Sequence, residues 1–211
     1  MHPRGLFVSA LALLLAPAIS QAVVLTFNAT LDGPSESPAN DSPGTGTATV
    51  VYDSVAHTMQ VSASFSNLLL VTAAGLPSAT TAAHIHAPTA VAGAGTAGVA
   101  TQTPSFAGFP LGVTSGSFIN TFDLTQASSF NAPFVTAHGG TLAGAEAAFV
   151  QYLNSGQAYF NIHTNAFGSG EIRGFLAPAA SVPDASGSTA SLLLLGLALL
   201  AFGRRLYRAA S

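Results

Sequence analysis

Three histidines of this sequence have the type and spacing of metal ligands. His84 and His86 are separated by one residue in a strand-like run, and His163 lies in a second such run. Side chains at positions i and i+2 of a strand point to the same face about 6.6 Å apart, so two imidazoles can converge on one ion. Three neutral imidazoles suit copper or zinc. Copper or zinc is therefore the expected cofactor if His84, His86 and His163 meet.

A purely structural role is the competing interpretation of the same histidines. Buried histidines usually form hydrogen bonds with backbone or carboxylate groups and hold loops in place. Of the other histidines, His57 falls in a predicted hairpin loop and is expected to be solvated, and His138 is the spare histidine between the two strand segments. The sequence leaves both interpretations of the three candidate ligands open.

Three polar residues close to His163 are candidates to support it. Asn161 is on the strand face of His163, and Glu171 and Arg173 lie two residues apart in the next strand-like run. One interpretation is a partly buried ion pair between Glu171 and Arg173 that fixes the final strand. The other is that Glu171 orients a histidine ring.

Composition and the remaining patterns argue against catalysis and against nucleic acid as a partner. The chain has no cysteine, and no nucleophile elbow or phosphate-binding glycine loop is recognisable. Charged residues are only 6% of the chain, and residues 23–181 carry one arginine against seven carboxylates, a net charge of −6 with neutral histidines. Such a surface repels phosphate backbones, which proteins bind through Lys and Arg. An enzyme is therefore not expected, and nucleic-acid binding is excluded.

The elements that must position the histidines are short strands. Apolar and polar residues alternate with the period of two that half-buried strands show, in the segments 23–31, 47–52, 59–65, 82–87, 117–124, 158–164 and 171–176. One helix is predicted from Leu142 onward, with Thr141 as its N-cap and Gly156 at its end. This pattern predicts an all-β fold, an antiparallel β-sandwich or partly closed barrel with one short helix.

Both ends of the chain carry the composition of targeting segments. Residues 1–22 have Arg4, an apolar run and a small-residue site at residues 20–22, the order of a secretory signal peptide. Residues 23–178 form the predicted β domain, and 179–189 form a small, polar linker. Residues 190–211 combine an apolar helix with an arginine cluster, which would stay on the cytoplasmic side of a membrane and leave the domain outside.

The C-terminal segment resembles the PEP-CTERM class of bacterial sorting signals, in its VPDSG variant. The matching residues are Val182, Pro183 and Asp184, followed by the apolar helix and by Arg204 and Arg205. The resemblance implies recognition by an exosortase-type membrane protease as a partner, a membrane anchor that is transient, and display at the cell surface or release. It also implies an association with exopolysaccharide or with other surface proteins. A plain C-terminal anchor is the alternative.

The domain itself resembles the CHRD family, the module that is repeated in chordin and found singly in exported microbial proteins. The motifs that carry this resemblance are His84-Ile85-His86, residues 155–164 and residues 170–176, together with Leu31-Asp32-Gly33 and Glu36. The resemblance implies an extracellular β-rich module without an established enzymatic activity. We therefore expect an exported surface or matrix module of binding or structural type.

A partial similarity to Cu/Zn superoxide dismutase supports the alternative function. A His-x-His pair on one strand and a later single histidine near a strand that holds an arginine are similar to the copper ligands of that enzyme. The zinc loop and the disulfide of that enzyme have no counterpart in this sequence. The alternative is a copper- or zinc-binding extracytoplasmic metalloprotein, with superoxide chemistry as its enzymatic form.

Overall fold

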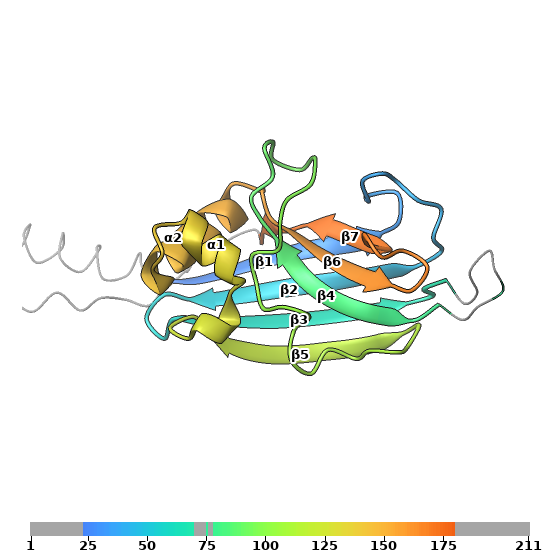
Figure 1. Ribbon diagram of the computed structural model, residues 1–211, viewed down its shortest axis with the longest axis horizontal. Coiled ribbons are helices and arrows are strands. Elements are labelled where there is room, and N and C mark those ends of the chain that lie inside the picture. The colour runs from blue at the N-terminus through green and yellow to red at the C-terminus, as the bar shows by residue number, and fades with distance from the viewer. Residues whose placement is uncertain (1–22, 70–74, 76–77, 180–211) are drawn as a thin grey trace, which may run out of the picture. The chain divides into compact units, whose positions relative to one another are not determined.

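Segments with alternating apolar residues form the strands of one antiparallel sheet. The computed structural model describes residues 23–69, 75 and 78–179 (Figure 1). The strands are β1 (Val24–Asp32), β2 (Thr45–Asp53), β3 (Thr58–Ser66), β4 (Thr80–His86), β5 (Gly116–Asp123), β6 (Tyr159–Thr164), β7 (Ile172–Phe175) and β8 (Ala177–Pro178). Every predicted strand segment corresponds to one of the first seven. The antiparallel all-β fold is confirmed.

The strand order places the two histidine-bearing strands next to each other. The order is β4-β6-β7-β1-β2-β3-β5, and β8 pairs with β1. β2 and β3 form the predicted hairpin, with Val50 opposite Val61, and β6 pairs with β7. In the sequence, 72 residues (87–158) separate the end of β4 from the start of β6, so their pairing is a long-range contact.

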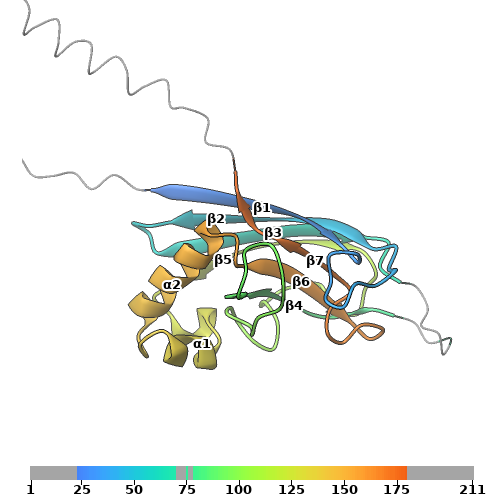
Figure 2. The same ribbon diagram turned by 90° about the horizontal axis from the view of Figure 1, so that it is seen from above.

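The sheet curls into a half-barrel around an aromatic core. Figure 2 shows β4, β6 and β7 curving below the layer of β1, β2 and β3. Phe106, from the segment between β4 and β5, packs between the two halves. Its ring centroid lies 5.9 Å from Phe118 and 5.1 Å from Phe122 of β5, and 6.0 Å from Phe160 of β6. This core holds β4 and β6 across from β5.

A close backbone approach joins the two halves where β7 meets β1. A Cβ atom at Gly174 would lie 2.0 Å from the carbonyl oxygen of Thr30, so only glycine fits there. One residue earlier, Arg173 is the register partner of Asp32. Arg173 is buried beside this close approach, with 4% of its surface exposed.

Helices cover one end of the sheet. α2 (Leu142–Asn154) is the predicted helix: the Thr141 side chain accepts a hydrogen bond from the Gly144 N–H, and Gly156 follows the helix with φ +69°. The structure adds a short α1 (Ala132–Ala137) and a 3-10 turn at Ala127–Ser129. In the described part of the chain, no helix is long and apolar enough to cross a membrane.

Candidate metal centre

β4 and β6 bring the three candidate ligands together. The two strands lie side by side (Figure 1). They pair with His84 opposite Asn161 and His163 opposite Ala82, so His84 and His163 are diagonal neighbours on one face. The ring centroids of His84 and His163 are 5.1 Å apart, and His86 is 5.7 Å from each of them. One ring nitrogen of each histidine lies within 4.8 Å of the corresponding nitrogens of the other two.

One nitrogen of each ring is held by a backbone carbonyl. His84 Nε2 lies 2.6 Å from the carbonyl oxygen of Pro104. His86 Nδ1 and His163 Nδ1 each lie 3.0 Å from a carbonyl oxygen, that of Ala97 and that of Gly168 respectively. A carbonyl oxygen only accepts hydrogen bonds, so each of these nitrogens carries the proton. The carbonyls therefore fix the tautomer of all three rings.

The opposite nitrogen of each ring carries a free lone pair. These nitrogens are Nδ1 of His84, Nε2 of His86 and Nε2 of His163, all buried, and none has a hydrogen-bond partner among the described residues. His163 is partly exposed as a residue, but its Nε2 atom is covered. A buried acceptor without a partner costs about 1–3 kcal/mol, so three in one cluster strongly favour a shared partner.

Burial keeps the three rings neutral near pH 7. It lowers the pKa of His86 to about 4, and hydrogen bonding to Ala97 offsets this only in part. Burial likewise lowers the pKa of His84 and of His163. A neutral imidazole is the form that binds a metal ion. The site is thus ready to bind without first losing a proton.

The donor set fits copper or zinc. Both ions accept imidazole nitrogen, and metal-binding histidines usually donate their other N–H to a carbonyl or carboxylate, as all three rings do here. Three protein ligands leave further coordination positions for a small molecule. No carboxylate of the described residues joins the cluster. The chemistry available is therefore the binding of one ion by three neutral ligands.

Glu171 has a structural position rather than contact with a histidine. The side chain is fully buried, and its two oxygens accept short hydrogen bonds from the hydroxyls of Ser42 and Thr164 and from the N–H of Leu69. These contacts tie β6 and two loops to the start of β7. The interpretation in which Glu171 orients a histidine ring is wrong, because the three groups that donate to its carboxylate belong to Ser42, Leu69 and Thr164 and not to a histidine.

The expected ion pair between Glu171 and Arg173 is also wrong. Arg173 Nε lies 3.7 Å from Glu36 Oε2 and also donates to the carbonyl oxygen of Ser35. Successive positions alternate across a strand, but residue 171 precedes β7, and its side chain turns toward the loops. The loop that contains Glu36 folds back over β7. Because Glu36 and Arg173 are far apart in the sequence, this contact could not be predicted from local patterns.

Two further residues complete the surroundings of the histidines. Tyr159 of β6 stacks on His86 with a centroid distance of 4.9 Å and an interplanar angle of 4°. Asn161 lies opposite His84 in the register, and its Nδ2 donates to the carbonyl oxygen of Ser169 at 3.4 Å. The sequence did not predict the stack of Tyr159 on His86 or the three backbone carbonyls that hold the rings, those of Ala97, Pro104 and Gly168. Every residue has a backbone carbonyl, so the sequence does not show which ones reach a histidine.

The other two described histidines have partners of their own. His57 is not simply solvated as predicted: its Nδ1 lies 2.9 Å from Oε1 of Glu146, which also accepts from the Tyr52 hydroxyl. His138 contacts the carbonyl oxygen of Phe134 and the Tyr152 hydroxyl. Neither residue belongs to the three-histidine cluster.

The tautomers give a direct prediction for the metal-free protein. At pH 7, long-range ¹H–¹⁵N NMR spectra should show His84 protonated at Nε2, and His86 and His163 protonated at Nδ1. The reason is that each of these nitrogens faces a carbonyl acceptor. His86 should titrate well below the usual range, because burial lowers its pKa to about 4. Spectra with the opposite tautomer at two of the rings would contradict this geometry.

Glu36 gives a prediction about stability and pH. Burial raises the pKa of Glu36 to about 7, although Arg173 lowers it in part. A carboxyl with a raised pKa favours folding below its unfolded pKa of about 4.5, and this contribution is lost as pH rises through 7. The free energy of unfolding of Glu36→Gln minus that of the parent should therefore be about 2 kcal/mol more favourable at pH 8 than at pH 5. Urea unfolding at both pH values measures this, and a constant difference would contradict it.

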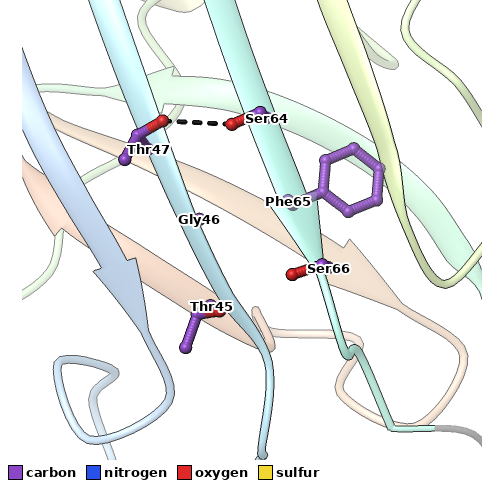
Figure 3. A pocket seen from close by; sticks show the side chains of 6 residues that line it. All are labelled: Thr45, Gly46, Thr47, Ser64, Phe65 and Ser66. Carbon is purple, nitrogen blue, oxygen red and sulfur yellow. Dashed lines mark hydrogen bonds between the residues drawn. The ribbon is translucent and has the colours of Figure 1, made fainter.

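A hollow along β2 and β3 offers no comparable chemistry. It is lined by Thr45, Gly46, Thr47, Ser64, Phe65 and Ser66 of β2 and β3 (Figure 3). The hydroxyls of Thr47 and Ser64 lie 3.2 Å apart and bond to each other. None of the six side chains is titratable near neutral pH, so the hollow holds no acid, base or strong metal ligand.

The predicted targeting elements lie outside the described residues. These are the signal peptide at 1–22, the sorting residues Val182, Pro183 and Asp184, and the C-terminal segment with Arg204 and Arg205.

Comparison with known proteins identifies the domain. The sequence pattern of the CHRD domain matches residues 27–176, from β1 to the residue after β7, and this range contains the three histidines. No curated protein and no solved structure gives a significant match. The matched range is more than half of the chain and agrees with the motifs at residues 84–86, 155–164 and 170–176. The chain therefore belongs to the CHRD domain family, whose members are usually extracellular modules.

Proposed function

We propose that this CHRD domain binds one copper or zinc ion through His84 Nδ1, His86 Nε2 and His163 Nε2. Two observations carry the proposal together: one ring nitrogen of each histidine lies within 4.8 Å of those of the other two, and each ring has one buried nitrogen with no partner among the described residues. Binding alone is the function that this geometry supports. Superoxide chemistry has no separate observation in its favour.

A metal ion satisfies this arrangement better than a water molecule does. One water molecule has two protons, so it can donate to two of the three acceptors and leaves the third without a partner. A neighbouring imidazolium could donate instead, but burial lowers the pKa of each ring and disfavours that form. One ion with three free coordination positions accepts all three lone pairs together.

Metal titration of the full chain tests the proposal. The protein, purified in mild detergent and stripped with a chelator, is loaded with Zn(II), or with Cu(I) under anaerobic conditions, and desalted. We expect one equivalent of bound metal per chain, together with an increase in thermal stability that grows with free metal concentration. Binding well below one equivalent for both ions would refute the proposal. The histidines would then act only as hydrogen-bond donors that hold loops.

We also propose that the domain is exported and sorted to the cell surface. This rests on the signal-peptide order of residues 1–22 and on the sorting residues Val182, Pro183, Asp184, Arg204 and Arg205. An exosortase-type protease would remove the tail. The domain would then act at the surface as a binding or structural module, in association with exopolysaccharide or surface proteins.

Mass spectrometry of the surface protein tests this sorting. We expect a mature N-terminus near Val23 and loss of the segment after the sorting residues. The variant Pro183→Ala should retain the tail, whereas Pro178→Ala, in the β domain, should be processed normally. Surface protein that keeps the tail in the parent would contradict exosortase processing and would favour a plain anchor.

A further inference from the structure

A buried cation lies one aromatic ring away from a metal ligand. The guanidinium carbon of Arg173 is 4.7 Å from the ring centroid of Tyr159, which stacks on His86 at 4.9 Å. Arg173 is 4% exposed and Tyr159 is 2% exposed. Because water is excluded from this stack, the charge of Arg173 is screened less than a surface charge would be.

One acid of the described residues lies within ion-pair distance of Arg173. This acid is Glu36, at 3.7 Å. Burial raises the pKa of Glu36 to about 7, so its carboxyl is only partly ionised near neutral pH. The three imidazoles are neutral, and no carboxylate of the described part of the chain joins them. An ion at this site therefore meets the positive charge of Arg173, and ionisation of Glu36, the acid in contact with Arg173, reduces that repulsion.

Such a field distinguishes ions by their charge. Two unit charges about 10 Å apart at an effective dielectric constant of 20 repel enough to weaken binding roughly tenfold. A divalent ion meets this penalty twice and a monovalent ion once. The uncompensated arginine therefore disfavours Zn(II) or Cu(II) by about tenfold relative to Cu(I). Ionised Glu36 cancels most of the difference.

We propose that Arg173 and Glu36 set the charge selectivity of the three-histidine site, with Arg173 favouring Cu(I) over divalent ions and Glu36 opposing it. This inference rests on the proposed metal site. Arg173 acts through space and through the stack with Tyr159, not as a ligand. Its Nη1 also donates to the carbonyl oxygen of Gly95, two residues before the Ala97 carbonyl that holds His86.

The experiment compares Zn(II) and Cu(I) affinities of the full chain at pH 8 by chelator competition. Glu36→Gln leaves Arg173 without its counter-charge and should lower Zn(II) affinity about three- to tenfold more than Cu(I) affinity. Arg173→Gln should shift the ratio of affinities in the opposite direction. Glu146→Gln is the matched control, because Glu146 is another buried carboxyl whose partners are Tyr52 and His57.

The Cu(II)/Cu(I) reduction potential of the copper-loaded protein is a second readout. If Arg173 and Glu36 had only a structural role, their replacement would not shift this potential in opposite directions. A tenfold change in the ratio of Cu(II) to Cu(I) affinities corresponds to about 59 mV for a one-electron couple. Glu36→Gln should raise the potential and Arg173→Gln should lower it. If Arg173→Gln does not fold, Glu36→Gln alone still tests the sign.

Three outcomes separate the two proposals. Opposite shifts in the two variants, or the predicted shift in Glu36→Gln alone, would support charge selectivity. One equivalent of metal with an unchanged affinity ratio and potential in Glu36→Gln would overturn it and leave the metal site intact. A parent chain that binds neither ion would overturn both.

Discussion

Replacement of any one of the three histidines by alanine will weaken metal binding by at least about 100-fold. In the proposed site each of His84, His86 and His163 would supply one of three ligands, and loss of outer-shell support alone typically costs 10- to 100-fold in affinity. The measurement is chelator competition with Zn(II) at pH 7 on the folded variants. The predicted loss is similar for all three, because no other protein ligand among the described residues lies in the cluster.

Two other histidines are matched controls for this prediction. His57→Ala and His138→Ala should keep one equivalent of metal, since His57 pairs with Glu146 and His138 bonds to Phe134 and Tyr152. Equal losses in controls and ligand variants would indicate non-specific binding. Ligand variants that keep the parent affinity would rule out the three-histidine site.

Replacement of Glu171 by alanine will destabilise the metal-free protein by about 3–5 kcal/mol. The change removes two buried oxygens and leaves three donors, on Ser42, Leu69 and Thr164, without their acceptor. Glu171→Gln keeps the shape of the side chain but loses part of its acceptor capacity, so it should cost less. Urea unfolding at pH 7 measures both free energies of unfolding.

A surface acid and the bound metal provide the controls for Glu171. Asp41→Ala, at an exposed position next to Ser42 in the same loop, should change stability by no more than about 0.5 kcal/mol. Glu171→Gln should still bind one equivalent of metal, because Glu171 does not touch a histidine. Loss of metal by folded Glu171→Gln would instead restore the interpretation in which it orients a ring. A cost below about 1 kcal/mol for Glu171→Ala would contradict the structural role.

Local patterns in the sequence were sufficient for the first seven strands and for the longer helix. Alternation in segments such as 59–65 predicted β3 because one face of that strand is buried and the other is not. The single predicted helix had a real cap at Thr141. The short α1 was missed, since six residues carry too little periodicity for a prediction.

Long-range contacts were not predictable in the same way. That β4 pairs with β6 follows from how the whole sheet is ordered, which strand propensity does not encode. The same limit explains the wrong partner for Arg173, because Glu36 reaches it from a loop 137 positions earlier. The His-x-His spacing predicted two candidate ligands on one face of a strand. The carbonyls that set the tautomers lie in loops, and the sequence alone does not show where those loops run in the folded protein.

X-ray absorption spectroscopy of the full chain loaded with one equivalent of Zn(II) measures the ligands directly. A three-histidine site predicts nitrogen ligands at about 2.0–2.1 Å with the multiple scattering of about three imidazole rings. The same sample of His86→Ala should show fewer rings. A parent spectrum with only oxygen ligands and no imidazole scattering would show that His84, His86 and His163 do not hold the ion together.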